Sequence, residues 1–254
     1  MLKKRLIGVV TVKQGYAVQS FGFGRWLPLG KPEVLVENLD RWGADEIVLQ
    51  CIDRSSRQLG PDVELLARVS RKGLATPLVY AGGIRSGDDA RAVIQAGADR
   101  IAIDALLRDD LARIPDIARV LGAQALIAAL PLSRNGNSLS WYDYRKRSET
   151  PLSDSLLDLL TDGTISEAMI VDWRNEGKPG GFDQQLLTLF PRDDIPLIAF
   201  GGLSAPAQLR EAFANPRIVA AGVGNFLNYS EHALQHFKES QDGVPLRPAA
   251  YEAL

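Results

Sequence analysis

The chain has 254 residues, of which 46% are hydrophobic and 24% charged, and its formal net charge at pH 7 is −2. That small charge argues against a nucleic-acid partner or an anionic membrane surface, and no apolar run approaches the ~18 residues of a membrane span. Cys51 is the only cysteine, so no intrachain disulfide can form, and we expect a cytoplasmic protein.

Short β-rich apolar runs alternate with longer stretches of helical period along the chain, as expected for repeated βα units. In chain order, the runs predict strands at 5–11, 46–52, 78–81, 100–104, 125–130, 168–173, 197–200 and 218–223. Helices are predicted near 32–42, 62–71, 87–95, 111–121, 153–160, 183–189, 205–214 and 230–239. Pro32 suits a first helical turn, and Asp62 and Ser230 are suitable N-caps. The length also matches the ~250 residues of one α/β (βα)8 TIM barrel.

An internal repeat supports this fold. The segment 76–85, TPLVYAGGIR, matches the segment 195–204, IPLIAFGGLS, about half a chain later. This period is too long for a solenoid and suits a duplicated four-unit half-barrel. No linker divides the chain, so residues 1–254 are predicted to form one barrel with halves of about 1–122 and 123–254.

The repeat places a glycine pair after one predicted strand in each half. Gly82-Gly83 and Gly201-Gly202 are either tight strand-to-helix turns or turns that let a phosphate approach the backbone N–H groups of a helix N-terminus. Gly224-Asn225 follows the last predicted strand, where barrel enzymes often bind phosphate. Two equivalent turns would suit a substrate with a phosphate at each end.

The order and spacing of several motifs carry a family resemblance. They are Lys4-Arg5-Leu6-Ile7, GADE at 43–46, GGIR at 82–85, AGADR at 96–100 and GGFD at 180–183. With these motifs the chain resembles the cyclase subunit of imidazole glycerol phosphate synthase almost from end to end. The resemblance implies a glutaminase partner (HisH-type) at the N-terminal face of the barrel. It also implies passage of ammonia through the barrel to a doubly phosphorylated ribotide at the C-terminal face.

The resemblance further implies an ammonia gate, which the family builds from four charged residues of alternating sign at the bottom of the barrel. The matching positions are Arg5, Glu46, Arg100 and Glu167, with arginine at 100 where the family usually has lysine. All four lie at or beside predicted strand starts. Charged residues also close barrel bases for stability, but four partly buried charges are costly unless paired. We interpret the set as a gate.

The catalytic positions of the family differ in this chain. The family uses an aspartate at the end of strand one and another at the end of strand five as general acid and base, and this chain has Thr11 and Pro131 there. Loss of one such group typically costs ~10²–10⁴ in rate. Asp172, Asp53 and Glu176 are the candidate substitutes. Four nearby family positions have also changed, an aspartate to Cys51, an asparagine to Asp104, a lysine to Gln19 and a serine to Phe200.

Other chemically suggestive residues have simpler interpretations. Cys51 is predicted to be a buried structural thiol, because His232 and His236 fall on the last helix, where they cannot activate it. That histidine pair has no third ligand, so no metal site is predicted, and no cofactor is expected. A basic aromatic loop after strand five could contact a partner or an anionic substrate, or simply face solvent; it contains Tyr142, Tyr144, Arg145, Lys146 and Arg147.

These observations lead to three functional hypotheses. In the first, the chain is a paralogue that receives ammonia from a glutaminase and conducts it to a different acceptor, such as a sugar in surface polysaccharide synthesis. A third enzyme at the C-terminal face could hold that acceptor. In the second, it is a working cyclase of histidine biosynthesis. In the third, it is a non-catalytic scaffold that only activates its glutaminase.

Overall fold

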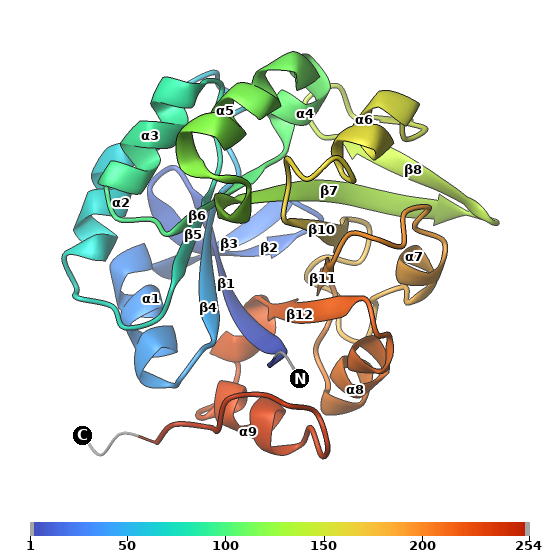
Figure 1. Ribbon diagram of the computed structural model, residues 1–254. Helices are drawn as coiled ribbons and strands as arrows, with labels where there is room; N and C mark the ends of the chain where they lie inside the picture. Colours follow the sequence, from blue (N-terminus) through green and yellow to red (C-terminus); the bar gives the residue numbers. More distant parts are fainter. Residues whose placement is uncertain (1–2, 252–254) are drawn as a thin grey trace.

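Eight parallel strands form a closed barrel that helices surround (Figure 1), in a computed structural model that describes residues 3–251. Around the barrel the strands are β1 (Arg5–Lys13), β4 (Glu46–Cys51), β5 (Leu78–Ala81), β6 (Arg100–Ile103), β7 (Leu126–Asn135), β10 (Glu167–Asp172), β11 (Leu197–Phe200) and β12 (Ile218–Val223). Each strand pairs with the next in parallel, and β12 pairs with β1. The predicted (βα)8 barrel is therefore confirmed.

The outer helices lie close to the predicted ranges. They are α1 (Pro32–Arg41), α2 (Val63–Ser70), α3 (Gly87–Gln95), α5 (Ile114–Leu121), α6 (Asp154–Leu159), α7 (Gln185–Thr188), α8 (Pro206–Ala214) and α9 (Ala233–Glu239). A short helix α4 (Ala105–Asp109) and three 3-10 turns were not predicted, namely η1 (Leu111–Arg113), η2 (Ala123–Ala125) and η3 (Asn225–Asn228).

Of the two predicted N-caps, one is confirmed and one is wrong. Asp62 caps α2 as predicted, since its carboxylate accepts a hydrogen bond of 3.1 Å from the backbone N–H of Leu65. The Ser230 cap is wrong. The chain turns through His232 in the left-handed conformation before α9 begins at Ala233, so Ser230 lies too early to cap the helix.

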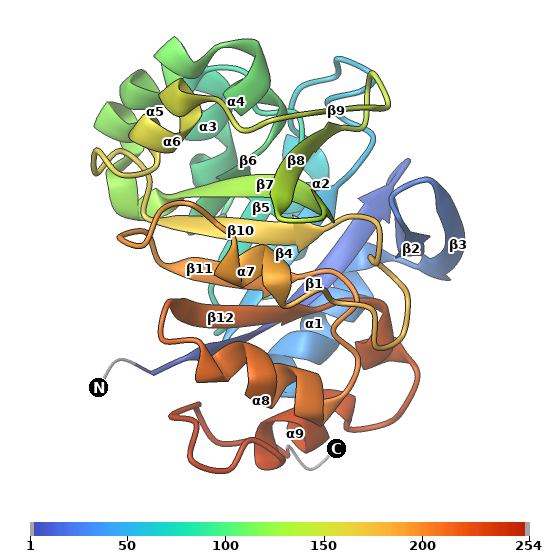
Figure 2. The same ribbon diagram turned by 90° about the vertical axis from the view of Figure 1, so that its right-hand side faces the viewer.

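The first strand of each half extends into a hairpin that was not predicted. β1 turns through Gln14-Gly15, both with positive φ, into β2 (Tyr16–Phe21), which pairs with β3 (Arg25–Gly30). β7 turns through residues 136–137 into β8 (Ser138–Asp143), which pairs with β9 (Ser148–Thr150). Two-residue loops with positive φ match the twist of antiparallel strands. In Figure 2 the barrel strands run from left to right, and the β2–β3 hairpin projects at the right, at their C-terminal ends.

The equivalent hairpins agree with a repeated half-barrel, while the division near residue 122 stays a prediction. Apolar side chains fill both the layer between strands and helices and the inside of the barrel. The inner cluster comprises Ile7, Val9, Val48, Val79, Ala81, Ala102, Ile127, Ala129, Met169, Val171, Ile198, Phe200 and Ala220. Nowhere in residues 3–251 does a helix have the length and apolar character needed to cross a membrane.

Candidate functional site

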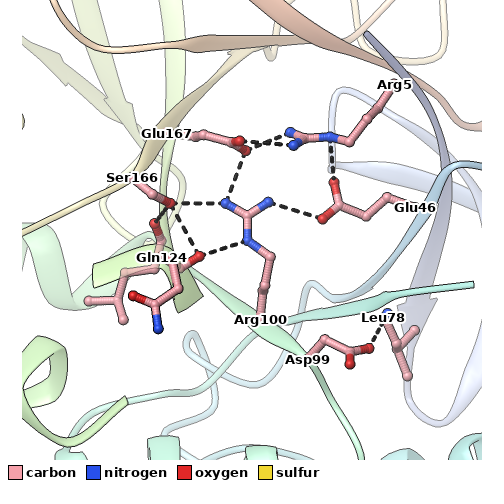
Figure 3. A network of polar contacts seen from close by, with 9 residues as sticks. Arg5, Glu46, Leu78, Asp99, Arg100, Gln124, Ser166 and Glu167 are labelled. Carbon is pink, nitrogen blue, oxygen red and sulfur yellow. Dashed lines mark hydrogen bonds and ion pairs between the residues drawn. The ribbon is translucent and has the colours of Figure 1, made fainter. Parts of the chain in front are cut away.

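Four charged side chains meet at the N-terminal end of the barrel (Figure 3), each from the first residue of a strand. We call Arg5, Glu46, Arg100 and Glu167 the charged ring. Glu167 binds Arg5 at 2.7 Å and Arg100 at 3.0 Å between charged atoms. Glu46 lies 3.0 Å from Arg100 and 3.4 Å from Arg5. The structure thus brings together all four predicted gate residues in a closed square of alternating sign.

The sides of this square are unequal. The two Arg5–Glu167 hydrogen bonds are bidentate, at 2.9 and 2.7 Å, which is the strong geometry for an arginine and a carboxylate. Arg100 is anchored further by the Ser166 hydroxyl at 2.9 Å and the Gln124 carbonyl at 3.0 Å. The Arg5 Nε and the facing Glu46 oxygen have no hydrogen-bond partner. The Arg5–Glu46 side is therefore the loosest of the four.

The charged ring is largely shielded from solvent. The exposed fraction of the side chain is 4% for Glu46, 12% for Glu167, 15% for Arg100 and 27% for Arg5. Burial opposes ionisation of Glu167, but its hydrogen bond to Arg5 and the charges of Arg5 and Arg100 outweigh it and lower the pKa of the carboxyl. Glu167 therefore stays ionised at neutral pH.

The inner apolar cluster lies between the charged ring and the C-terminal ends of the strands. Its members are at most 7% exposed, and those toward the C-terminal end of three adjacent strands are small, namely Ala81, Ala102 and Ala129. An apolar interior strongly disfavours an ion but admits a neutral molecule at much lower cost.

Thr11 and Pro131 both lie at the C-terminal end of the barrel, at the level the family resemblance implied. Thr11 is paired with Gln50 of β4, and Pro131 with Val171 of β10. Both are buried, and neither side chain can transfer a proton near neutral pH.

A cavity opens at this end, on the side of the first half-barrel. Its volume is about 80 Å³, room for a few water-sized molecules. We call it the C-terminal cavity. It is lined by Phe23, Gln50, Cys51, Ile52, Ser55, Ala81, Gly82, Gly83, Ile84, Ala102, Ile103, Asp104, Ala105, Ala129, Pro131, Tyr142, Tyr144 and Val171. The three alanines and Val171 also belong to the inner apolar cluster, so the cavity begins where the barrel interior ends.

Asp104 supplies the carboxyl group of the C-terminal cavity. It follows β6, and its side chain is hydrogen-bonded to Tyr144, which also bonds Ser55. Burial raises the pKa of Asp104 to about 7, although the charges of Arg108 and Arg145 act against it. Asp104 can therefore both donate and accept a proton near neutral pH. Sequence reasoning noted that aspartate replaces the family's asparagine at this position but missed this property, which only burial creates.

The predicted basic aromatic loop forms the wall of this cavity. Tyr142 stacks on Trp173 with ring centroids 3.7 Å apart, and Tyr144 turns inward to Asp104. Arg145 is held by Asp109 at 2.7 Å and by Asp143 at 3.4 Å. Only Lys146 and Arg147 of the predicted set are exposed. Of the predicted loop, Tyr142 lies in β8, and residues 144–147 form the turn between β8 and β9. Both tyrosines line the cavity.

Asp172 and Glu176, the candidate catalytic substitutes, are engaged in loop contacts. The Asp172 carboxylate accepts hydrogen bonds of 2.9 Å from the Asn175 amide and 2.8 Å from the Asp183 N–H. Glu176 accepts from the Ser20 hydroxyl at 3.0 Å and the Phe23 N–H at 3.2 Å, and so anchors the β2–β3 hairpin. Burial raises the pKa of both carboxyls. Hydrogen bonds from the surrounding loops therefore fix the orientation of both carboxyl groups.

The two glycine pairs have backbone conformations that exclude other residues. Gly82 and Gly83 have φ of +128° and +74°, and an added Cβ would lie 2.3 Å from a carbonyl oxygen at each. Gly201 and Gly202 are similarly crowded, at 2.6 and 2.8 Å. Tight packing of one loop on the next therefore accounts for these glycines.

At the first pair, the expected phosphate-binding groups are already occupied. The N–H of Gly83 donates to the Ser55 hydroxyl at 3.1 Å, and the N–H of Arg85 donates to Asp89 at 3.0 Å. Near the second pair, Asn225 is engaged by the backbone of Ser20, at 3.1 and 2.6 Å. Phosphate binding at either turn stays a prediction.

The second half-barrel is filled at its C-terminal end. The Phe200 ring packs over Gly222 and Gly224, where an added Cβ would lie 3.2 and 3.6 Å from ring atoms. Among the described residues, the cavity lining includes none from β11 or β12. The serine expected here from the family would leave this volume open.

The remaining residues that the sequence analysis singled out are buried or make structural contacts, or lie at the surface. Cys51 is buried, and burial raises the pKa of its thiol to about 12, so it stays protonated at neutral pH. Asp53, another candidate substitute, pairs with Arg57 at 3.2 Å beside the β1–β2 turn. Gln19 lies in β2. His236 is exposed on α9, and His232 lies at its N-terminal end beside Tyr251.

Comparison with known proteins gives the relationships of the chain. The family described as "Histidine biosynthesis protein" matches residues 5–233. The putative imidazole glycerol phosphate synthase subunit hisF2 of Vibrio vulnificus is 29% identical, over 92% of this chain and 86% of its own length. The imidazole glycerol phosphate synthase subunit HisF of Solibacter usitatus is 30% identical, over 98% of this chain and 100% of its own. HisF of Bacillus subtilis is 29% identical, over 97% and 100%.

The match covers the charged ring, all eight barrel strands and both hairpins. Similarity of this extent shows common descent of the whole barrel, including both of its ends. The chain therefore belongs to the histidine biosynthesis protein family, as a barrel of the type found in the HisF subunit of imidazole glycerol phosphate synthase.

Proposed function

We propose that this chain is the barrel subunit of a glutamine amidotransferase complex. A glutaminase of the HisH type docks at the N-terminal face and releases ammonia at the charged ring. Ammonia then crosses the barrel interior to an acceptor at the C-terminal face. That acceptor is not the doubly phosphorylated ribotide of the family, and a third enzyme at this face could hold it.

The charged ring is the observation that carries the proposal. A gate needs one contact that can break, and the Arg5–Glu46 ion pair of 3.4 Å is the longest in the ring. Movement of Arg5 toward Glu167, to which it is bound twice, would open the ring without leaving a charge unpaired. The apolar interior beyond it favours neutral ammonia over ammonium.

The C-terminal end supports a different acceptor. Thr11 and Pro131 offer no proton-transfer group, and Asp104 in its ionised form would repel a phosphate. Phe200 fills the end of the second half-barrel, where the ribotide's second phosphate would need room.

The test combines this chain with its glutaminase partner and measures glutamine hydrolysis. We expect the wild-type barrel to bind and stimulate the partner. An absence of binding and stimulation would contradict the proposal. Glu46→Gln should then reduce delivery of ¹⁵N from amide-labelled glutamine into the product when unlabelled ammonium is present in the medium. A scaffold that only activates the partner would retain the same labelling in this variant.

A working cyclase of histidine biosynthesis is the second candidate. The match over nearly the full length of HisF subunits favours it. It requires other groups to replace both missing aspartates. Complementation of a histidine auxotroph that lacks the cyclase separates the candidates, because growth supported by this chain would establish the cyclase.

A further inference from the structure

The two arginines of the charged ring are held in different ways (Figure 3). Each of the three guanidinium nitrogens of Arg100 has a partner. Its Nη1 donates to Glu46 at 3.0 Å, and its Nε donates to the Gln124 carbonyl oxygen at 3.0 Å. Its Nη2 lies between Glu167, at 3.0 Å, and the Ser166 hydroxyl, at 2.9 Å. Two of these four partners are uncharged and lie outside the ring.

The Ser166 hydroxyl is oriented to accept a hydrogen bond from Arg100. Ser166 directly precedes β10, and its hydroxyl donates to the carbonyl oxygen of Leu126, the first residue of β7, at 2.7 Å. The same carbonyl accepts the backbone N–H of Ser166 at 3.1 Å. Because its one proton is used in this way, the hydroxyl oxygen offers a lone pair to the guanidinium. Ser166 therefore links Arg100 to the backbone of β7.

Arg5 has no comparable anchor. Its Nη1 and Nη2 both donate to the same carboxylate, that of Glu167, and its Nε has no hydrogen-bond partner. Within residues 3–251, the Arg5 side chain makes no hydrogen bond outside the ring. Its exposed fraction is 27%, against 15% for Arg100. Arg5 is thus the arginine that is free to move.

We propose that Ser166 is a positioning residue of the gate, which holds Arg100 in place so that the ring opens only between Arg5 and Glu46. The inference deepens the proposed function, on which it rests for the role of the ring as a gate. One Glu167 oxygen contacts both arginines, at 2.7 and 3.0 Å, so a shift of Arg5 with Glu167 pulls on Arg100. The Ser166 hydroxyl opposes this pull at the same nitrogen of Arg100.

Arginine at position 100 suits this fixed role. A planar guanidinium meets partners in several fixed directions at once, whereas lysine carries one nitrogen on a flexible chain. The family resemblance assigns lysine as the usual residue here. Arg100 instead uses its extra nitrogens on Ser166 and Gln124.

The first test uses the isolated full chain and measures solvent exchange of the arginine Nε–H protons by NMR. The Arg100 proton should exchange more slowly than that of Arg5, because only the former is hydrogen-bonded. Ser166→Ala removes a hydrogen bond to a charged group and should speed exchange at Arg100 about tenfold. Ser166→Thr keeps the hydroxyl and should restore slow exchange. Equal exchange at Arg100 in the wild type and Ser166→Ala would overturn the inference.

The matched control is Ser240→Ala at the end of α9. The Ser240 hydroxyl also donates to a backbone carbonyl, that of Phe237 at 2.8 Å, and accepts from a side chain, Gln241 at 3.1 Å. It has the bonding pattern of Ser166 but no contact with the ring. Its loss should leave exchange at Arg100 unchanged.

The second test repeats the ¹⁵N labelling with the glutaminase complex. Ser166→Ala should lower the ¹⁵N fraction of the product several-fold, because a ring that opens on two sides exchanges its ammonia with the medium. Ser166→Thr should restore the wild-type fraction, and Ser240→Ala should keep it. Wild-type labelling in Ser166→Ala would refute the positioning role while leaving the conduit intact. A wild-type complex that delivers no label would instead refute the proposed function, and with it the gate that Ser166 serves.

Discussion

The two ends of this barrel differ in how strongly their side chains depend on one another. At the N-terminal end, four charged residues form a closed square with contacts of 2.7 to 3.4 Å. At the C-terminal end, Thr11 and Pro131 occupy the positions to which the family resemblance assigns the catalytic aspartates, and Phe200 fills one half. An arrangement of four mutually dependent charges is hard to lose one residue at a time, because each loss leaves two like charges sharing one partner.

The C-terminal end lacks that mutual constraint. Its side chains belong to loops and hairpins whose positions are held by other contacts, such as Glu176 to the β2–β3 hairpin and Tyr142 to Trp173. A residue at a strand end can therefore change without unfolding the barrel. Under the proposed function, this contrast lets one barrel retain an entrance for a small molecule while its reaction changes.

The largest expected effect comes from breaking the charged ring. Glu167→Gln leaves Arg5 and Arg100 facing only Glu46, and we expect the free energy of unfolding to fall by about 3–5 kcal/mol. Urea denaturation measures it. The control is Glu37→Gln, which also pairs with two cations, Arg41 and Lys72, but lies on the surface. Similar losses of unfolding free energy in the two variants would mean that the charged ring stabilises the fold no more than an exposed ion-pair network does.

A slightly smaller effect should follow from emptying the second half of the C-terminal end. Phe200 is 3% exposed, so Phe200→Ala should cost about 3 kcal/mol of stability and leave a cavity over Gly222 and Gly224. Tyr16→Ala, at a side chain 60% exposed, should cost far less. Equal unfolding midpoints of Phe200→Ala and the wild type would show that this ring does not fill the barrel.

Asp104 should give the C-terminal end a pH dependence. An unfolded aspartate has a pKa near 3.9, against about 7 for Asp104, so the folded state binds more protons between those values. Stability therefore falls as the pH rises through this window. Relative to the wild type, Asp104→Asn should gain roughly 3–4 kcal/mol between pH 4 and pH 8. Asp172 and Glu176 contribute in both proteins and cancel in the difference. A constant difference across this range would contradict burial of the carboxyl.

The smallest effect concerns Cys51. Its pKa of about 12 keeps the thiol protonated at pH 8, and it is 3% exposed. Iodoacetamide should therefore label the native protein far more slowly than the urea-unfolded chain. Rapid labelling of the native protein would indicate a reactive thiol at the cavity. Cys51 would then be a candidate nucleophile and not a buried structural thiol.

Most of the barrel was predictable from the sequence. The strands β5, β11 and β12 have the predicted bounds, because buried parallel strands are continuous apolar runs between turn residues. The two hairpins were missed, although residues 136–137 are a Gly-Asn pair of the kind that closes a two-residue hairpin. Strand β3 gives no apolar alternation, since Arg25, Trp26 and Leu27 are all exposed.

The site was predictable only in part. The charged ring was implied by the family resemblance. Its members lie at or beside predicted strand starts, and the starts of parallel strands converge at one end of a barrel. The raised pKa of Asp104 was not predictable, because it depends on burial among Tyr144, Tyr142 and Phe23, which come from two hairpins absent from the prediction. Contacts of Asp172, Glu176 and Asn225 with loops likewise require the fold.

One measurement compares the two ends directly, namely the number of ribotide molecules consumed per glutamine hydrolysed by the complex of this chain with its glutaminase. The account predicts that glutamine is hydrolysed while this ratio stays near zero, because the entrance works and the old reaction centre does not. A ratio near one would contradict it, since ammonia entering at the charged ring would then be used in the family's own reaction.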